Sequence, residues 1–293
     1  MTERQSLHTS ASSVDQTLAG ANAPGSRHLG HGIVLSAAFF LSPMLAGASP
    51  AAAGDFMEVD AAIVFAVDIS SSIDPQYADL QRQGHAEALR SADVAAAIAG
   101  GMTGCIATTY VEWSVPGWLR TVLPWTKICR DEDSASAAAE ILAHGDTGFE
   151  RRGRGSTAIS YAIEASGILL DRLPGRATRK IIDISANGTN NDGMPVTAAR
   201  DRVVAKGYVV NAIVLAHSEP GVTDDLPAYF RDSVIGGPGA FVIVPDSASD
   251  YSTALQRKLV LEIGATVPRP DNGPPSMRIA RVAEFDIWRL DAN

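Results

Sequence analysis

The most constraining feature of the sequence is an unbroken apolar run, AAIVFAV at residues 61–67, which ends at Asp68 and is followed by Ser70 and Ser72. A run without polar alternation is typical of a strand covered on both faces, as in a parallel sheet flanked by helices. Such sheets bind ligands beyond the carboxyl ends of their strands, where Asp68 is expected to emerge. One carboxylate and two hydroxyls are hard oxygen donors, which favour Mg²⁺, Mn²⁺ or Ca²⁺ over zinc.

The same pentapeptide also has a simpler interpretation. Asp and Ser are favoured helix N-caps and turn formers, so the DxSxS segment could merely start a helix. Residues 74–98 are expected to form that helix, because Asp74-Pro75 is a typical helix start and Gly100-Gly101 a typical stop.

Predicted strands and helices alternate through the rest of the chain. Two strands, 106–113 and 118–125, flank an SVPG turn and form a hairpin. Further strands are expected at 179–185, 208–215 and 240–244, and helices at 133–144, 157–173, 195–206, 226–234 and 249–263. The predicted fold is an α/β doubly wound, mostly parallel sheet with one antiparallel edge hairpin.

The two ends of the chain differ from this central part. Residues 1–27 lack apolar periodicity and are expected to be disordered, while the apolar run 32–45 and the alanines at 51–53 indicate a secretory signal peptide. An uncleaved signal anchor is the alternative, although the run is short for a membrane span. The predicted organisation is a leader with signal peptide at 1–53, one domain at 58–266, and a Pro-rich linker and tail at 267–293. The mature chain is expected in the periplasm or outside the cell, without a transmembrane span.

The net charge limits the class of partner, and the cysteine content supports export. The chain of 293 residues carries a net charge of −9, which argues against nucleic acid as a partner. Cys105 and Cys129 fall near each other at the open end of the predicted hairpin, and one disulfide fits an exported protein. Two unpaired buried thiols are the alternative.

Three separated segments carry a resemblance to a known family. They are Asp68-Ile69-Ser70-Ser71-Ser72, then Gly155-Ser156-Thr157 at the start of a helix, and Ser185-Ala186-Asn187-Gly188 after a strand. In order and spacing they resemble the metal-ion-dependent adhesion site of von Willebrand factor A (VWA) domains, over roughly residues 58–266. The stretches 109–114 and 181–185 further resemble a group of exported bacterial VWA-like proteins of unassigned function.

The resemblance implies a role for each motif residue. Ser70, Ser72 and Thr157 would offer hydroxyl oxygens to a divalent cation, with Mg²⁺ expected first and Mn²⁺ or Ca²⁺ as alternatives. Asp68 would hold metal-bound waters and orient the serines. One coordination position would stay open for an acidic side chain of a protein partner.

Asn187 departs from the family pattern, which usually has Asp at this position. An amide keeps the carbonyl oxygen but loses the negative charge, so we expect weaker cation binding. Asp183 and Asp192, nearby in the sequence, are candidates to compensate for the missing charge.

Two other functions have partial motifs in the sequence. The GxGxxA pattern at 153–158 does not follow a predicted strand, so a nucleotide site is not expected. A hydrolase using Ser70 and Ser72 is an alternative, but the sequence has no GxSxG elbow. Candidate partner-binding residues are Arg151, Arg152, Arg154 and His217, which are otherwise solvated loop residues.

The sequence therefore predicts an exported VWA-like protein that binds a protein partner through a divalent cation and catalyses no reaction. A metal-independent interaction scaffold is the main alternative, and the hydrolase is the second.

Overall fold

The computed structural model describes residues 57–149, 155–215 and 225–264. Contacts within the chain separate Met1–Pro50 from Ala51–Asn293, and every described residue belongs to the second unit. The predictions made for the leader and signal peptide, for the linker and tail after residue 266, for the three loop arginines and for His217 lie outside the described residues.

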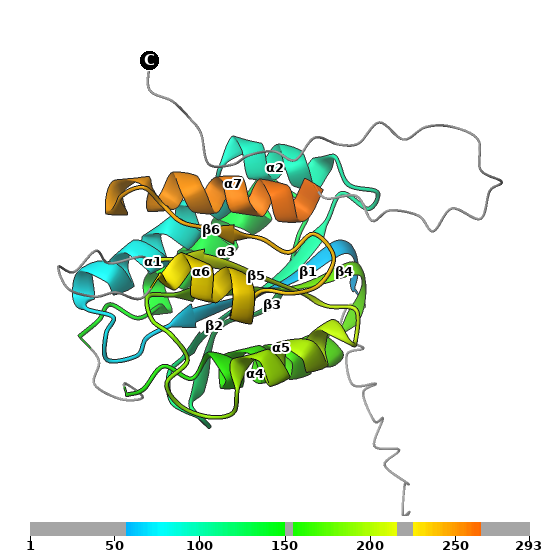
Figure 1. Ribbon diagram of the computed structural model, residues 1–293. Coiled ribbons are helices and arrows are strands. Elements are labelled where there is room, and N and C mark those ends of the chain that lie inside the picture. Colours follow the sequence, from blue (N-terminus) through cyan, green and yellow to red (C-terminus); the bar gives the residue numbers. More distant parts are fainter. Residues whose placement is uncertain (1–56, 150–154, 216–224, 265–293) are drawn as a thin grey trace, which may run out of the picture. The chain divides into compact units, whose positions relative to one another are not determined.

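Within the described residues, six strands form one sheet in the order β3-β2-β1-β4-β5-β6 (Figure 1). The strands are β1 (Met57–Asp68), β2 (Ile106–Trp113), β3 (Leu119–Ile128), β4 (Gly175–Ala186), β5 (Val209–Val214) and β6 (Val242–Ile243). Neighbouring strands are parallel except β2 and β3, which are antiparallel at the edge. The predicted α/β sheet with one antiparallel edge hairpin is therefore confirmed, with β6 shorter than expected.

The helices follow the predicted order, with one correction. They are α1 (Pro75–Leu89), α2 (Ala92–Ala99), α3 (Asp131–His144), α4 (Ile159–Asp171), α5 (Val196–Val204), α6 (Leu226–Tyr229) with a π-helical turn at Phe230–Val234, a 3₁₀ turn at Ala248–Asp250, and α7 (Tyr251–Gly264). The prediction of a single helix at 74–98 was wrong, because the first helix ends at Leu89 and a second begins at Ala92. The hydroxyl of Ser91 accepts a hydrogen bond from the Val94 N–H and starts α2 as its N-cap.

Helices cover both faces of the sheet, which explains the apolar run in β1. Every residue at 61–67 is at most 1% exposed. Ala62, Val64 and Ala66 pack in a cluster with residues of α4 and α5, while Ile63 and Phe65 pack with residues of α1, α2, α3 and α7. Figure 1 shows α4 and α5 on one side of the sheet and α2 and α7 on the other. Alternate side chains thus enter two different cores, so neither face needs polar residues.

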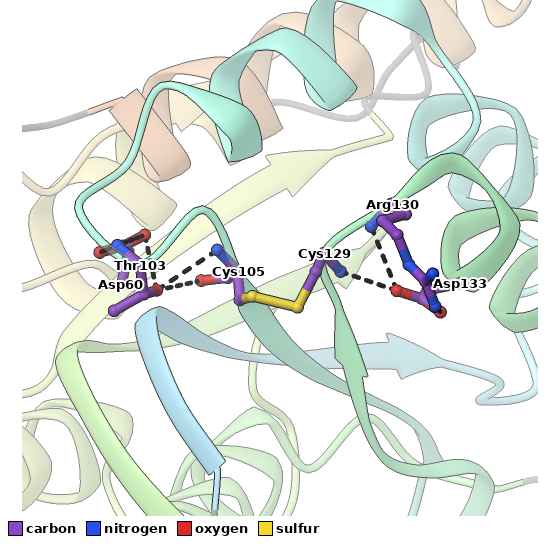
Figure 2. The surroundings of a disulfide bond; sticks show 6 residues. All are labelled: Asp60, Thr103, Cys105, Cys129, Arg130 and Asp133. Atoms are coloured by element: carbon purple, nitrogen blue, oxygen red, sulfur yellow. Dashed lines mark hydrogen bonds and ion pairs between the residues drawn. A yellow bond between two sulfur atoms is a disulfide. The ribbon is translucent and has the colours of Figure 1, made fainter.

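The open end of the hairpin is closed by a disulfide between Cys105 and Cys129 (Figure 2). Asp60 of β1 accepts hydrogen bonds from the backbone N–H of Thr103, at 3.0 Å, and from its hydroxyl, at 2.9 Å. On the other side, Asp133 of α3 accepts a hydrogen bond from the Cys129 N–H at 3.0 Å. The disulfide therefore joins two segments that are already tied to β1 and α3.

The sheet order creates a switch point between β1 and β4. From β1 the chain continues through α1 and α2 to β2 on one side, whereas β4 lies on the other side of β1 and is reached through α4. The connections after β1 and before β4 cover opposite faces of the sheet. This is the place where open α/β sheets bind ligands, beyond the carboxyl ends of the strands.

Candidate metal-binding site

The first side of the site is built at the end of β1. Asp68 is fully buried, and its Oδ1 accepts a hydrogen bond from the Ser70 N–H at 2.7 Å. This contact closes a turn of the Asx type, which directs Ser70 and Ser72 to the same side and leaves their Oγ atoms 3.0 Å apart. The side chain of Gln81 on α1 donates to the Asp68 carbonyl at 3.0 Å. The DxSxS segment is therefore a fixed turn with two adjacent hydroxyls.

The second side comes from the turn before α4. Thr157, which is 4% exposed, donates a hydrogen bond from its hydroxyl to Ser70 Oγ at 3.1 Å. Backbone contacts hold this turn in place, because the Ser71 N–H donates to the Gly155 carbonyl at 2.9 Å and the Ala158 N–H donates to the Ser114 carbonyl at 2.9 Å. The structure thus brings Thr157 to the two serines.

The third side is Asn187, directly after β4. Its Oδ1 accepts a hydrogen bond from the Ser72 hydroxyl at 2.7 Å, and its Nδ2 donates to the Ser72 carbonyl at 3.1 Å. Since Ser72 uses its proton on Asn187, the Ser70 hydroxyl is the donor to Ser72. A directed chain of hydrogen bonds therefore runs from Thr157 through Ser70 and Ser72 to the Asn187 amide oxygen.

The oxygen atoms of this cluster are of the kind that binds a hard divalent cation, and their single formal charge predicts weak binding. Three hydroxyl oxygens and one amide oxygen gather around a buried carboxylate, and such oxygens suit Mg²⁺, Mn²⁺ or Ca²⁺. Ser72 is exposed, so the cluster is reachable from solvent. Asp68 is the one acidic member of the motif, and in the described parts of the chain no three His, Cys, Asp or Glu residues group as a metal site. One formal negative charge gives a weaker pull on a cation than two would.

Asp183 does not compensate for the missing charge at Asn187. Its carboxylate is fully buried below the strand end and lies 2.5 Å from the ammonium group of Lys258 on α7. Asp183 therefore pairs with a buried cation on the face of the sheet that α7 covers. Asp192 lies closer to the site, where it accepts a hydrogen bond from the Ser156 hydroxyl at 2.5 Å, beside Thr157.

Lys258 is the centre of a buried ionic cluster beneath the site. It is shared between Asp183 and Glu262, with an Nζ to Oε1 distance of 2.5 Å to the latter. Asn211 also donates to Glu262, at 2.8 Å. Burial, together with the charge of Asp183, raises the pKa of Glu262 to about 7, against the opposing effect of Lys258. The cluster fastens α7 to the sheet and is closed to solvent.

Three positioning residues were missed from the sequence. Asn191 accepts from the Thr157 N–H at 2.8 Å, and its own N–H donates to the Thr157 carbonyl at 3.0 Å. Asn190 accepts from the Ser160 N–H at 2.8 Å and so caps α4, whose N-cap residue has no capping side chain. Gln81, described above, links Asp68 to Ser185, whose hydroxyl donates to Gln81 Oε1 at 2.7 Å. The adjacent asparagines in a turn sequence were the available signal for two of them.

The described histidines of the domain lie away from the serines. His85 is fully buried, between the rings of Phe65 and Tyr110, and donates to the Gln81 carbonyl at 2.7 Å. Burial lowers the pKa of His85 to about 4, so it is neutral near pH 7. His144 lies at the end of α3 beside Glu140.

Comparison with solved structures gives fold relatives at low sequence identity. Proximal thread matrix protein 1 from the mussel byssus is 19% identical, with a TM-score of 0.50 over 70% of this chain and 48% of that chain. A von Willebrand factor type A protein from Catenulispora acidiphila is 14% identical, with a TM-score of 0.49 over 72% of this chain and 44% of that chain. The manganese-loaded TRAP protein of Plasmodium vivax is 12% identical, with a TM-score of 0.45 over 71% and 74%.

The chain spans less than half the length of the mussel and Catenulispora structures that it matches. A search of curated proteins gave no match. None of the helices in 57–149, 155–215 and 225–264 has the length and apolar character needed to cross a membrane.

The family described as "Protein of unknown function (DUF1194)" matches residues 58–267. The chain therefore belongs to the DUF1194 family, and its domain has the fold of the mussel byssus protein.

Proposed function

We propose that this protein is an exported binding protein that engages a protein partner through a divalent cation and catalyses no reaction. The observation that carries the proposal is the meeting of three hydroxyls from two distant segments, Ser70, Ser72 and Thr157, with successive oxygens 3.0 and 3.1 Å apart. They lie at the switch point of the sheet, where a partner can approach.

In this proposal each residue of the cluster has a distinct task. The three hydroxyls coordinate the cation, Mg²⁺ in the first place, while Asp68 holds the serine turn and supplies the negative charge. Asn187 adds a neutral oxygen next to Ser72. The bound cation supplies an electrophilic position that accepts a carboxylate oxygen of the partner. Arg151, Arg152, Arg154 and His217 are proposed as partner contacts around this position.

The proposed organisation of the chain serves the same role. Residues 1–53 act as leader and signal peptide, 58–266 as the binding domain, and 267–293 as linker and tail. A disulfide fits an oxidising compartment, which supports a periplasmic or extracellular location.

A metal-independent scaffold is the second candidate, and one observation favours it. Every hydroxyl of the cluster already has a hydrogen-bond partner within the chain, so the turn is stable without a cation. Among the residues that the structure describes, the hydrolase alternative gains no such support, because His85 is buried between two rings and His144 lies on α3 beside Glu140.

Calorimetric titration with Mn²⁺ and Mg²⁺ tests the cation. The wild-type protein should bind one ion, and Thr157→Val, which removes the hydroxyl at nearly constant volume, should weaken binding at least about tenfold, or ~1.4 kcal/mol. Thr126→Val, on β3, is the matched control and should bind as the wild type does. Equal binding by Thr157→Val would place the ion elsewhere.

Partner capture from an envelope extract, with and without chelator, tests the second part of the proposal. Capture that needs Mg²⁺ and is lost with Thr157→Val supports the cation-dependent role. Capture that is indifferent to chelator and to Thr157→Val supports the scaffold instead.

A further inference from the structure

Asn187 is followed by Gly188 at a place where the backbone is free of the sheet. Strand β4 ends at Ala186, and both Asn187 and Gly188 are partly exposed. Among the described residues, none accepts a hydrogen bond from the Gly188 N–H. Gly has no Cβ to shield its own nitrogen, and a Cβ added at Gly188 would meet Thr157 Oγ1 at 3.7 Å, an ordinary contact, so Gly188→Ala fits at this position.

The side-chain amide of Asn187 is polarised by its neighbour. The Ser72 hydroxyl donates to Asn187 Oδ1 at 2.7 Å. When a nucleophile adds to the Cγ carbon, negative charge develops on this oxygen, and a donor already in place stabilises it. The nitrogen on the other arm of the amide is held only by the Ser72 carbonyl, at 3.1 Å, at a partly exposed position from which it can leave.

We infer that Asn187 is a deamidation site, at which hydrolysis converts the amide of the oxygen cluster into a carboxylate. The Gly188 nitrogen attacks Asn187 Cγ and forms the new C–N bond of a succinimide. The Cγ–Nδ2 bond breaks, and Nδ2 leaves as ammonia with the proton lost by the Gly188 nitrogen. Water then adds to the ring and reopens it, so the net change is the replacement of NH₂ by OH without any oxidation or reduction.

The product differs from the starting protein in charge at the site itself. Ring opening at Cγ gives an ordinary Asp, whose carboxylate lies beside Ser72 and doubles the formal negative charge that Asp68 alone provides. A second anionic oxygen strengthens the attraction for a divalent cation. Opening at the main-chain carbonyl of residue 187 gives isoaspartate instead. Isoaspartate lengthens the backbone by one carbon and does not place a carboxylate beside Ser72. This consequence rests on the proposed function, whereas the modification itself does not.

Other asparagines make useful internal references. Asn190, Asn191 and Asn211 are followed by Asn, Asp and Ala, whose Cβ atoms shield the following nitrogen as no atom does at Gly188. The other Asn-Gly pair of the chain is Asn272-Gly273, outside the described residues. Peptide mapping separates these positions.

The test incubates the full mature chain at mildly alkaline pH, follows residue 187 by peptide mass spectrometry, and separates the Asp and isoaspartate forms before titration. We expect the 187 peptide to gain the mass of the NH₂ to OH exchange. The separated Asp form should bind Mn²⁺ about tenfold more tightly than fresh protein, or ~1.4 kcal/mol, and a directly made Asn187→Asp variant should match it. Gly188→Ala, which keeps Asn187 but shields the attacking nitrogen, should keep its amide and its affinity.

Two results would overturn the inference: a 187 peptide that keeps its amide while Asn272 converts, or conversion at the same rate in Gly188→Ala. The proposed function fails separately. If the wild-type protein and Asn187→Asp both bind no Mn²⁺, the cation role of the cluster is refuted, although the mass change would still establish the modification.

Discussion

The hydroxyl oxygen of Thr157 lies 3.1 Å from that of Ser70, although 87 residues separate them in the sequence. The contact does not depend on a ligand, because Asn191 bonds both the backbone N–H and the backbone carbonyl of Thr157. A site whose parts are fixed in advance loses less entropy when it binds a cation or partner. Asn191 is therefore as much a part of the site as the hydroxyls that it positions.

Asn191→Ala should lower the free energy of unfolding by ~1–3 kcal/mol, because the buried Thr157 N–H loses its acceptor. Urea unfolding measures the change. Thr189→Ala is the control, since the Thr189 side chain makes no hydrogen bond within the described residues, and it should leave the midpoint nearly unchanged. The Mn²⁺ affinity of Asn191→Ala should fall as well. Loss of stability without loss of affinity would mean that Asn191 supports the turn but not the site.

The sequence was informative wherever one local rule decided the outcome. The apolar run at 61–67 predicted a strand with two covered faces, which the structure has. Burial along a single strand needs no knowledge of distant partners. The meeting of Ser70, Thr157 and Asn187 was expected only from the resemblance to VWA domains, because no local pattern joins these segments.

The errors arose at one local helix break and at one distant partner. Apolar residues continue at helical spacing past Arg90, so only the capping hydroxyl of Ser91 marks the break between α1 and α2. Asp183 looked available because its strand leads to Asn187, but Lys258 lies on the last helix, and sequence spacing says nothing about which helix reaches β4. Long-range pairing of buried charges is the part that local patterns do not carry.

Glu262→Gln should change the pH dependence of stability. The pKa of Glu262 is raised to about 7 by burial and by Asp183, from an ordinary value of 4.5. The folded protein therefore holds a proton that the unfolded chain has released, so the free energy of unfolding falls as pH rises from 4.5 to about 7, by on the order of 1 kcal/mol per pH unit. The variant should lack this slope.

His85 changes the free energy of unfolding with pH in the opposite direction to Glu262, and it does so equally in the wild type and in Glu262→Gln. Its pKa is lowered to about 4, so its contribution is complete above pH 6.5 and is lost as pH falls toward 4. The readout is therefore the difference between wild type and Glu262→Gln in chemical unfolding from pH 5 to pH 8. Parallel curves would show that Glu262 is ionised in the folded protein throughout.

Removal of the disulfide should cost about 3 kcal/mol of unfolding free energy, because Cys105 and Cys129 close a loop with a sequence separation of 24. The variant Cys105→Ala/Cys129→Ala and the wild type in reductant should give the same denaturant midpoint. Cation affinity should not change, since the disulfide lies at the amino end of β2 while Ser70 and Ser72 follow the carboxyl end of β1. Weaker Mn²⁺ binding by the reduced protein would reveal a coupling along the strands.

Gly148 is the point at which the loop after α3 rests on the start of α1 at Pro75, three residues beyond Ser72. Its φ is +81°, and a Cβ at this position would lie 2.3 Å from Pro75 Cα, so Gly148→Ala requires the backbone to move in addition to the strain of a positive φ. Gly207→Ala is the matched control, with φ +82° and nothing within 4 Å of the added carbon. The control should cost about 1–2 kcal/mol of unfolding free energy, and Gly148→Ala should cost more and also weaken Mn²⁺ binding, because Pro75 shifts Ser72. If Gly148→Ala and Gly207→Ala lose the same unfolding free energy and Mn²⁺ affinity is unchanged, the loop around Gly148 moves and the serine turn keeps its position.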